Sequence, residues 1–383
     1  MSLDGPFSPP STLIDTPNDE QDDFYTDNDL FNIQSWGADL SFRELISRYD
    51  DDELVKPELQ RNYVWDKSEA SRFIDSILLG LPVPSIFLAK TSDEKLLIID
   101  GFQRLMSVRD FVKGIFSKDD SLFRLSRTEK IHERWRGKSF NELDSEQQRK
   151  IRNTTIHAII FMQRQPSNDD TSLFQVFERI NSSGRILLPQ EIRNCVYQGP
   201  MNSLIMDLNK NVHWRALFGK ETPDDRMRDV EFILRFFALS DDSLLLNEQA
   251  PSRISLKKYL NQYMSNHNED DKIIGFRAIF EDTMSFIYNV FGENAFHNLS
   301  PTVTGQYVPR FSPTVFDAIA IACRKFIEAT GYNSSHIDIQ QCQQNKLVLL
   351  GDESYQFYLS QETMRTPHIK KRVDTAYMVL FGD

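Results

Sequence analysis

The chain has 383 residues, of which 40% are hydrophobic and 26% charged, and a formal net charge of -12 at pH 7. This length accommodates two domains with sizeable cores, and no apolar run approaches the ~20 residues that span a bilayer. The three cysteines, Cys195, Cys323 and Cys342, lie far apart and lack the spacing of a disulfide framework or a zinc site. We therefore expect a cytoplasmic protein without a membrane partner.

Residues 1–35 differ in composition from the rest of the chain. They contain eight acidic residues and no lysine or arginine, so the remainder carries a net charge of only -4. Four prolines, Pro6, Pro9, Pro10 and Pro17, interrupt this segment. A polar, acidic and proline-rich composition predicts a disordered leader. Because the negative charge is concentrated there, the net charge of the chain does not exclude a nucleic-acid partner.

Residues 36–166 combine helical and strand patterns. Apolar residues at helical spacing predict helices near residues 42–49, 70–79, 105–112 and 148–153, and apolar runs predict strands near 86–89, 96–99 and 154–162. The segment from Pro166 to Asp170 has the composition of a domain boundary. Residues 167–383 then show apolar stripes at helical spacing, in 201–208, 230–239, 256–264, 273–291 and 315–327. The predicted fold class is α+β, an α/β domain followed by a mostly α-helical domain.

The junction between the 96–99 strand and the following helix has the strongest functional signal. The strand passes directly into Asp100-Gly101, and Gln103 and Arg104 fall in the first turn of the helix. Glycine permits a tight turn, and the free amides of a helix N-terminus attract an anion. Arg104 adds a planar fork for phosphate or carboxylate. Asp100 can hold a sugar hydroxyl, a metal ion or that arginine.

An arginine among aromatic residues lies upstream, at Arg61, Tyr63 and Trp65. Tyr63 and Trp65 can stack on a nucleotide base, but aromatic residues two apart on an extended segment more often face the core together. Both interpretations stay open from the sequence.

Residues 124–152 form a basic stretch, with nine basic and five acidic residues. One interpretation is a basic face for a polyanion such as DNA. The other, which the interleaving of acids and bases favours, is a solvated helix whose charges pair within the helix.

The order of these motifs resembles the N-terminal domain of the GmrSD type IV restriction enzymes, in the ParB and sulfiredoxin-like superfamily. The resemblance covers roughly residues 40 to 200. Its matching segments are Arg61 to Trp65, Asp100 to Arg104, Phe177 to Gly184 and Glu191 to Asn194. One departure is Phe102, where the family has glutamine, so any polar role of that side chain is lost.

The resemblance implies a ParB-like nucleotide-binding domain over residues 36–166, with the following roles. Arg61 and Arg104 would clamp phosphates, which the backbone amides from Gly101 through Phe102 to Gln103 would cradle. Asp100 would bind Mg²⁺ or order a water, and Gln103 would orient that water or a phosphate oxygen. Asn181 lies in a segment with two interpretations, a C-terminal helix stop or a polar loop over the nucleotide.

Two functions follow from the resemblance. In the first, the chain binds and hydrolyses a nucleoside triphosphate with Mg²⁺ in a prokaryotic anti-phage or restriction-like system that acts on or with DNA. In the second, the pocket is a non-hydrolytic nucleotide switch or a DNA-backbone site, and the helical half, residues 167–383, is an interaction module. The helical half shows no His-Asn-His nuclease signature, so cleavage of DNA would fall to a separate nuclease or defence subunit.

Overall fold

The computed structural model describes residues 14, 33–56, 65–90, 94–163, 174–176, 178, 188–197, 199–303, 305–331 and 337–382. These residues pack as two compact units, which we call the α/β unit, up to Val196, and the helical unit, from Tyr197 onward together with Ile14. The domain boundary that we expected near residue 166 lies outside the described residues and stays a prediction, as does almost all of the expected leader.

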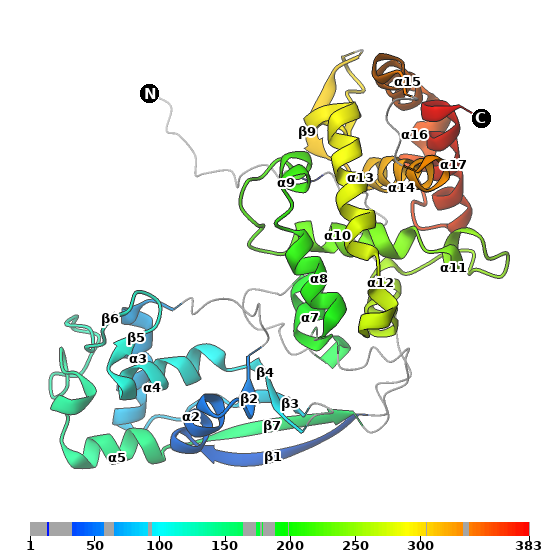
Figure 1. Ribbon diagram of the computed structural model, residues 1–383. Helices are drawn as coiled ribbons and strands as arrows, with labels where there is room; N and C mark the ends of the chain where they lie inside the picture. Colours follow the sequence, from blue (N-terminus) through cyan, green and yellow to red (C-terminus); the bar gives the residue numbers. More distant parts are fainter. Residues whose placement is uncertain are drawn as a thin grey trace, which may run out of the picture. The chain divides into compact units, whose positions relative to one another are not determined.

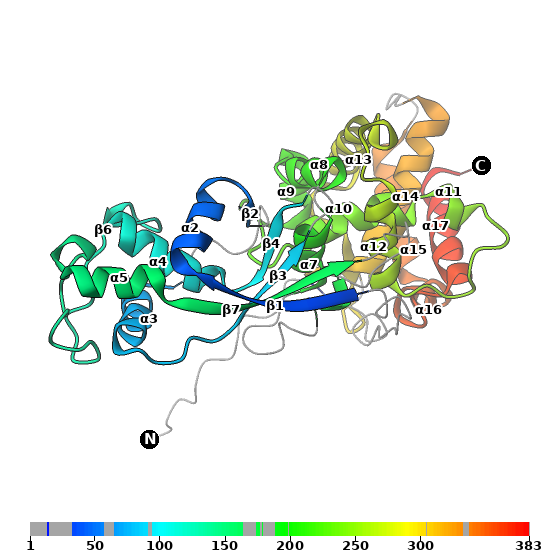
Figure 2. The same cartoon turned by 90° about the horizontal axis from the view of Figure 1, so that it is seen from below.

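A five-stranded mixed sheet organises the α/β unit (Figures 1 and 2). Its strands lie in the order β1-β7-β3-β4-β2, with bounds Ile33–Ser41 for β1, Thr155–Gln163 for β7, Ile86–Lys90 for β3, Leu96–Asp100 for β4 and Leu54–Val55 for β2. β1 pairs with β7 antiparallel, for example Asp39 with His157, and β7 pairs with β3 in parallel. β3 and β4 are antiparallel, and β4 and β2 are parallel. The sheet therefore combines local and long-range pairings.

Strand β4 is buried on both faces, which explains its uninterrupted apolar sequence. Leu96 and Ile98 belong to the larger core, beneath helices α2 to α5. Leu97 and Ile99 belong to a smaller core on the other face, with Ile192. Alternate side chains of the strand thus serve two cores, and the strand end at Asp100 is held in place from both sides.

The helices of the larger core are those that the apolar spacing predicts. Their bounds are Phe42–Asp50 for α2, Lys67–Leu79 for α3, Phe102–Lys113 for α4 and Ser145–Asn153 for α5; α7, Pro189–Val196, follows later in the chain. Asp66 and Asp144 begin α3 and α5 with capping boxes, and Gly80 ends α3 in the left-handed conformation. Two short elements, the hairpin of β5 (Ile115–Phe116) and β6 (Ser121–Leu122) and the 3₁₀ turn η2 (Phe140–Glu142), complete this part of the unit.

The helical unit confirms the second half of the fold prediction. Its α-helices are α8 (Pro200–Leu208), α9 (Val212–Phe218), α10 (Arg228–Leu239), α11 (Asp242–Leu245), α12 (Leu256–Asn266), α13 (Phe276–Phe291), α14 (Pro313–Thr330), α15 (Ile339–Gly351), α16 (Glu353–Ser360) and α17 (Thr366–Phe381). A small hairpin of β8 (His297–Leu299) and β9 (Tyr307–Phe311), which the sequence did not predict, lies between α13 and α14. None of the helices described is long and apolar enough to cross a membrane.

A buried charge cluster holds three helices of this unit together. Asp317 of α14 accepts hydrogen bonds from Arg235 of α10, at 2.7 and 2.6 Å, and from Arg372 of α17, at 3.1 Å. All three side chains are at most 2% exposed. Removing one partner from a set of charges this deeply buried is costly, so α10, α14 and α17 depend on all three side chains being in place.

Candidate functional site

The predicted site lies where β4 ends and α4 begins, inside the α/β unit (Figure 1). Gly101 connects the two elements with a φ of +106°, a left-handed conformation that side chains disfavour. A β-carbon at this position would collide with the side chain of Ile86 on β3. Glycine is therefore needed for close approach of the junction to the neighbouring strand as well as for the turn.

Arg104 ties the junction to the loop between α3 and β3. One of its terminal nitrogens, Nη1, donates to the carbonyl oxygens of Pro84 and Ser85, each at 2.7 Å. The other, Nη2, forms an ion pair with Asp100. Of the three roles open to Asp100 in the sequence, the structure shows the pairing with arginine. The Arg104 side chain is 14% exposed and the Asp100 side chain 44%, so the carboxylate is the accessible half of the pair.

Gln103 fixes the backbone at the start of α3. Its side-chain oxygen Oε1 accepts a hydrogen bond from the backbone N–H of Trp65 at 3.1 Å. The Trp65 ring packs edge-on against Phe73, with ring centroids 5.9 Å apart, beside the larger core. Trp65 also lines an open cleft of about 440 Å³, together with Arg72 and Lys130. Trp65 thus combines the core position with an accessible edge.

Phe102 has an apolar role. Its side chain is 6% exposed and belongs to the larger core. The ring lies 6.2 Å from the ring of Tyr49, and the Lys56 ammonium lies 4.8 Å from its centroid. This packing explains how phenylalanine replaces the glutamine of the family motif. Any contribution of Phe102 to ligand binding is left to its backbone N–H.

The structure brings Asp100, Gly101, Gln103 and Arg104 together at one junction. It adds Pro84, Ser85 and Ile86, whose only sequence signal was the proline-containing link that precedes β3. Arg61, Tyr63 and Asn181 lie outside the described residues, and their predicted roles stay predictions.

Asp100 is the residue that we expected to bind a metal ion. Among the described residues, no group of three or more His, Cys, Asp or Glu side chains is placed to hold one. Mg²⁺ differs from zinc in this respect, because it is commonly bound by one or two carboxylates together with substrate phosphates and water. The half-exposed carboxylate of Asp100 fits that kind of site as a single protein ligand.

Comparison with known proteins relates this unit to one family. Residues 42–198 match the family model of the GmrSD restriction endonuclease, N-terminal domain. No curated protein and no solved structure matches the chain significantly. The matched range begins with the first residue of α2 and includes the sheet strands β2, β3, β4 and β7 with the whole β4–α4 junction. The resemblance seen in the motifs is thereby confirmed: residues 42–198 match the GmrSD restriction endonuclease N-terminal domain family, and this match relates the chain to restriction systems.

Proposed function

We propose that this GmrSD N-terminal domain binds a nucleoside triphosphate at the β4–α4 junction and hydrolyses it with Mg²⁺, as the ParB-like nucleotide module of an anti-phage system that acts with DNA. The observation that carries the proposal is the Asp100–Arg104 ion pair, which lies beside a helix N-terminus whose cap, Gly101, has no side chain. An anion that approaches this end of α4 meets helix amides and a guanidinium together.

The two halves of the pair suit two different tasks. Arg104 is held by two neutral carbonyl oxygens and by one exposed carboxylate. A phosphate oxygen can replace that carboxylate on Nη2 with little loss of hydrogen bonding, because guanidinium groups bind both anions in the same planar geometry. Asp100 is then available to a divalent ion, which would neutralise charge on the phosphates. Gln103, on the same turn, would orient a water or a phosphate oxygen.

The same contacts favour a second candidate, a non-hydrolytic nucleotide switch. Arg104 links α4 to the loop at Pro84 and Ser85, and Gln103 links α4 to the backbone at Trp65. If a phosphate replaced the Asp100 carboxylate on Arg104, the hydrogen bonds to these two segments would change in strength. The conformation of both segments would then respond to nucleotide binding without hydrolysis.

Phosphate release from each of the four nucleoside triphosphates, with and without Mg²⁺ and with and without DNA, separates the two candidates. Hydrolysis that requires Mg²⁺ supports the enzyme. Binding measured by calorimetry without phosphate release supports the switch. Absence of both would contradict nucleotide binding at this domain.

Arg104→Ala is expected to weaken nucleotide binding by about one to two orders of magnitude, because hydrogen bonds to charged groups contribute roughly 1.5–3 kcal/mol. Arg104→Lys should restore little, since the planar fork is lost. Arg109→Ala is the matched control: it removes an arginine of the same helix that pairs with Asp50 at 2.8 Å. Calorimetric titration gives the affinities, and melting temperatures check the fold. Unchanged affinity in Arg104→Ala would exclude the phosphate role.

Asp100→Asn is expected to lower turnover by about two orders of magnitude and to leave binding without Mg²⁺ intact, because asparagine keeps the size of the side chain but not the charge that a divalent ion needs. Asp50→Asn, which removes a carboxylate paired with Arg109 and Lys113 of α4, is the control. A normal rate of phosphate release from Asp100→Asn would make Asp100 a structural residue.

A further inference from the structure

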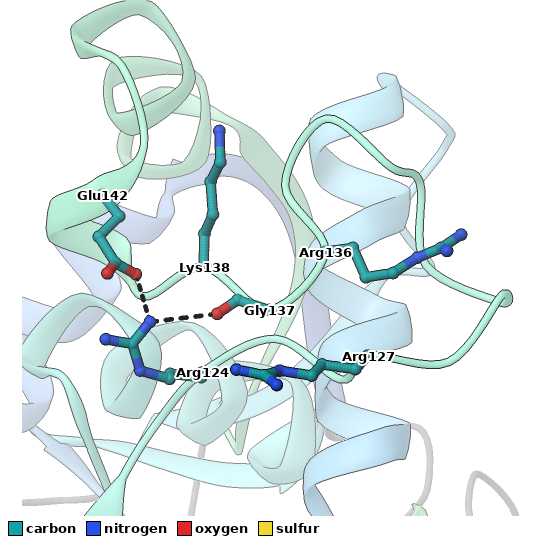
Figure 3. Close-up of a pocket in the computed structure, with 6 residues that line it drawn as sticks. All are labelled: Arg124, Arg127, Arg136, Gly137, Lys138 and Glu142. Carbon is teal, nitrogen blue, oxygen red and sulfur yellow. Dashed lines mark hydrogen bonds and ion pairs between the residues drawn. The ribbon is translucent and has the colours of Figure 1, made fainter.

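Four basic side chains line one open cleft of about 630 Å³ in the α/β unit, which we call the basic cleft (Figure 3). Its lining residues are Arg124, Arg127, Arg136, Gly137, Lys138 and Glu142. Two backbone hydrogen bonds bring its two sides together, from Leu125 N to Lys138 O at 2.9 Å and from Gly137 N to Leu125 O at 3.1 Å. The basic residues are thus gathered by the folding of the segment and not by their spacing in the sequence.

The basic cleft corrects our expectation of a solvated helix over residues 124–152. Only Ser145–Asn153 is α-helical in this stretch, and the residues of the cleft precede it, in irregular segments, a turn and the 3₁₀ segment η2. Pairing between helical neighbours therefore cannot neutralise the bases at residues 124–138. The interleaved acidic residues are a poor guide here because the rule that pairs residues three or four apart holds only within a helix.

The backbone that carries the cleft is anchored in the core. Trp135 is 5% exposed, and its indole N–H donates to the Asp75 carboxylate of α3 at 2.6 Å. The same carboxylate accepts from the backbone N–H of His132 at 2.9 Å. A third link runs from the backbone N–H of Ser126 to Ser71 Oγ on α3, at 2.9 Å. These contacts hold the segment firmly, so its outward side chains start from fixed positions.

The charge of the cleft is not balanced by its surroundings. Arg124 pairs with Glu142 at 2.6 Å and also donates to the Gly137 carbonyl oxygen at 3.2 Å. Arg136 donates to a neutral carbonyl oxygen, that of Ile131, at 3.0 Å. No carboxylate among the described residues forms an ion pair with Arg127, Arg136 or Lys138. Like charges gathered in this way repel one another, and an anionic ligand relieves the repulsion.

We propose that the basic cleft binds the phosphate backbone of DNA. Small-molecule sites enclose most of their ligand, whereas this cleft is open and four of its six lining residues are basic, with Arg124 and Arg127 exposed. Arginine and lysine side chains on a fixed backbone are suited to bind the phosphates of a DNA duplex. Such contacts position a protein on DNA without reading the base sequence. The cleft shares no residue with the β4–α4 junction, so this inference does not depend on nucleotide binding there.

The test measures binding of a short fluorescent DNA duplex to the full chain, by anisotropy, between about 50 and 200 mM salt. Arg127→Gln/Lys138→Gln is expected to weaken binding about tenfold to hundredfold at the lowest salt. It should also reduce the slope of log affinity against log salt by about 2, since each phosphate contact contributes about 0.9. The control, Arg134→Gln/Arg149→Gln, removes the same charge from two exposed residues outside the cleft lining, and it should change affinity less than about threefold.

A second variant, Glu142→Gln, is expected to strengthen DNA binding and so tests the proposal in the opposite direction. Hydrogen bonds from the Ser139 backbone N–H and from Arg124 lower the pKa of Glu142 to about 2, so this carboxylate is ionised at neutral pH and competes for Arg124. Glu142→Gln keeps an oxygen that can accept the Ser139 hydrogen bonds but removes the charge. DNA binding should become about threefold to tenfold tighter at low salt.

Three outcomes would overturn the proposal. The first is an equal loss of DNA affinity in the cleft variant and its control, which would mean that only the net charge of the chain matters. The second is a cleft variant that loses affinity for a free triphosphate while its affinity for DNA is unchanged. The third is absence of duplex binding by the unaltered chain at the lowest salt. Melting temperatures of all variants within a few degrees of the unaltered chain establish that the folds are intact.

Discussion

Replacing Asp317 by alanine is expected to lower the free energy of unfolding of the helical unit by about 3–5 kcal/mol, the usual cost of removing one partner from a buried ion pair. Asp317 supplies the carboxylate of its cluster, between Arg235 and Arg372, which are 2% and 0% exposed. Its loss leaves two guanidinium groups buried without that carboxylate. Calorimetry of the full chain, with the transitions of the two units assigned separately, gives the change.

Arg235→Met is the matched control for this prediction. Methionine fills a similar volume, and the remaining Arg372–Asp317 pair is electrically balanced. Arg235→Met should therefore lower the free energy of unfolding clearly less than Asp317→Ala. The net charge of the cluster falls to zero in Arg235→Met, whereas it rises to +2 in Asp317→Ala. Equal losses would mean that the cluster acts through packing and not through charge.

Gly101→Ala is expected to lower the free energy of unfolding of the α/β unit by about 2–5 kcal/mol. About 1–2 kcal/mol comes from the left-handed conformation, with φ of +106°, and about 1–3 kcal/mol from crowding against Ile86. The steric part is separable. Gly114, at the other end of α4, has φ of +82°, but apart from its chain neighbours no residue comes within 4 Å of the place that a β-carbon would take there.

Gly114→Ala should therefore cost only the conformational part, about 1–2 kcal/mol. Chemical denaturation of the two variants side by side measures the difference. If both lose the same stability, the approach of β3 to the junction is looser than the contact with Ile86 implies, and glycine is present at position 101 for its turn alone.

Much of the α/β unit could be predicted because its elements have strong local patterns. The apolar residues of α2 and α3 recur at helical spacing, and the run in β4 is long enough to mark a buried strand. Strand β1 escaped prediction because most of its side chains are exposed, so Ile33–Ser41 shows no clear apolar alternation. The order of the strands depends on pairings between distant residues, which no local pattern contains.

In the candidate site, too, the features set by neighbouring residues could be predicted and those set by distant residues could not. Asp100, Gly101, Gln103 and Arg104 are adjacent in sequence, so their meeting at one turn could be predicted from the strand, the glycine and the helix start. The carbonyl groups that hold Arg104 come from about twenty residues upstream. Their role depends on how the loop before β3 folds back, and the prolines of that loop are its only sign in the sequence.

The position of β7 has a consequence for how the α/β unit folds. β7 is the last strand of the sheet along the chain, yet it lies between β1 and β3. Asp39 and His157, which face each other across β1 and β7, are 118 residues apart in sequence. Closing so large a loop costs entropy before any contact forms, so high contact order should make assembly of this sheet slow. Until β7 arrives, β1 has no neighbour in the sheet, so β1 and β7 should join the locally paired strands β3 and β4 late in folding.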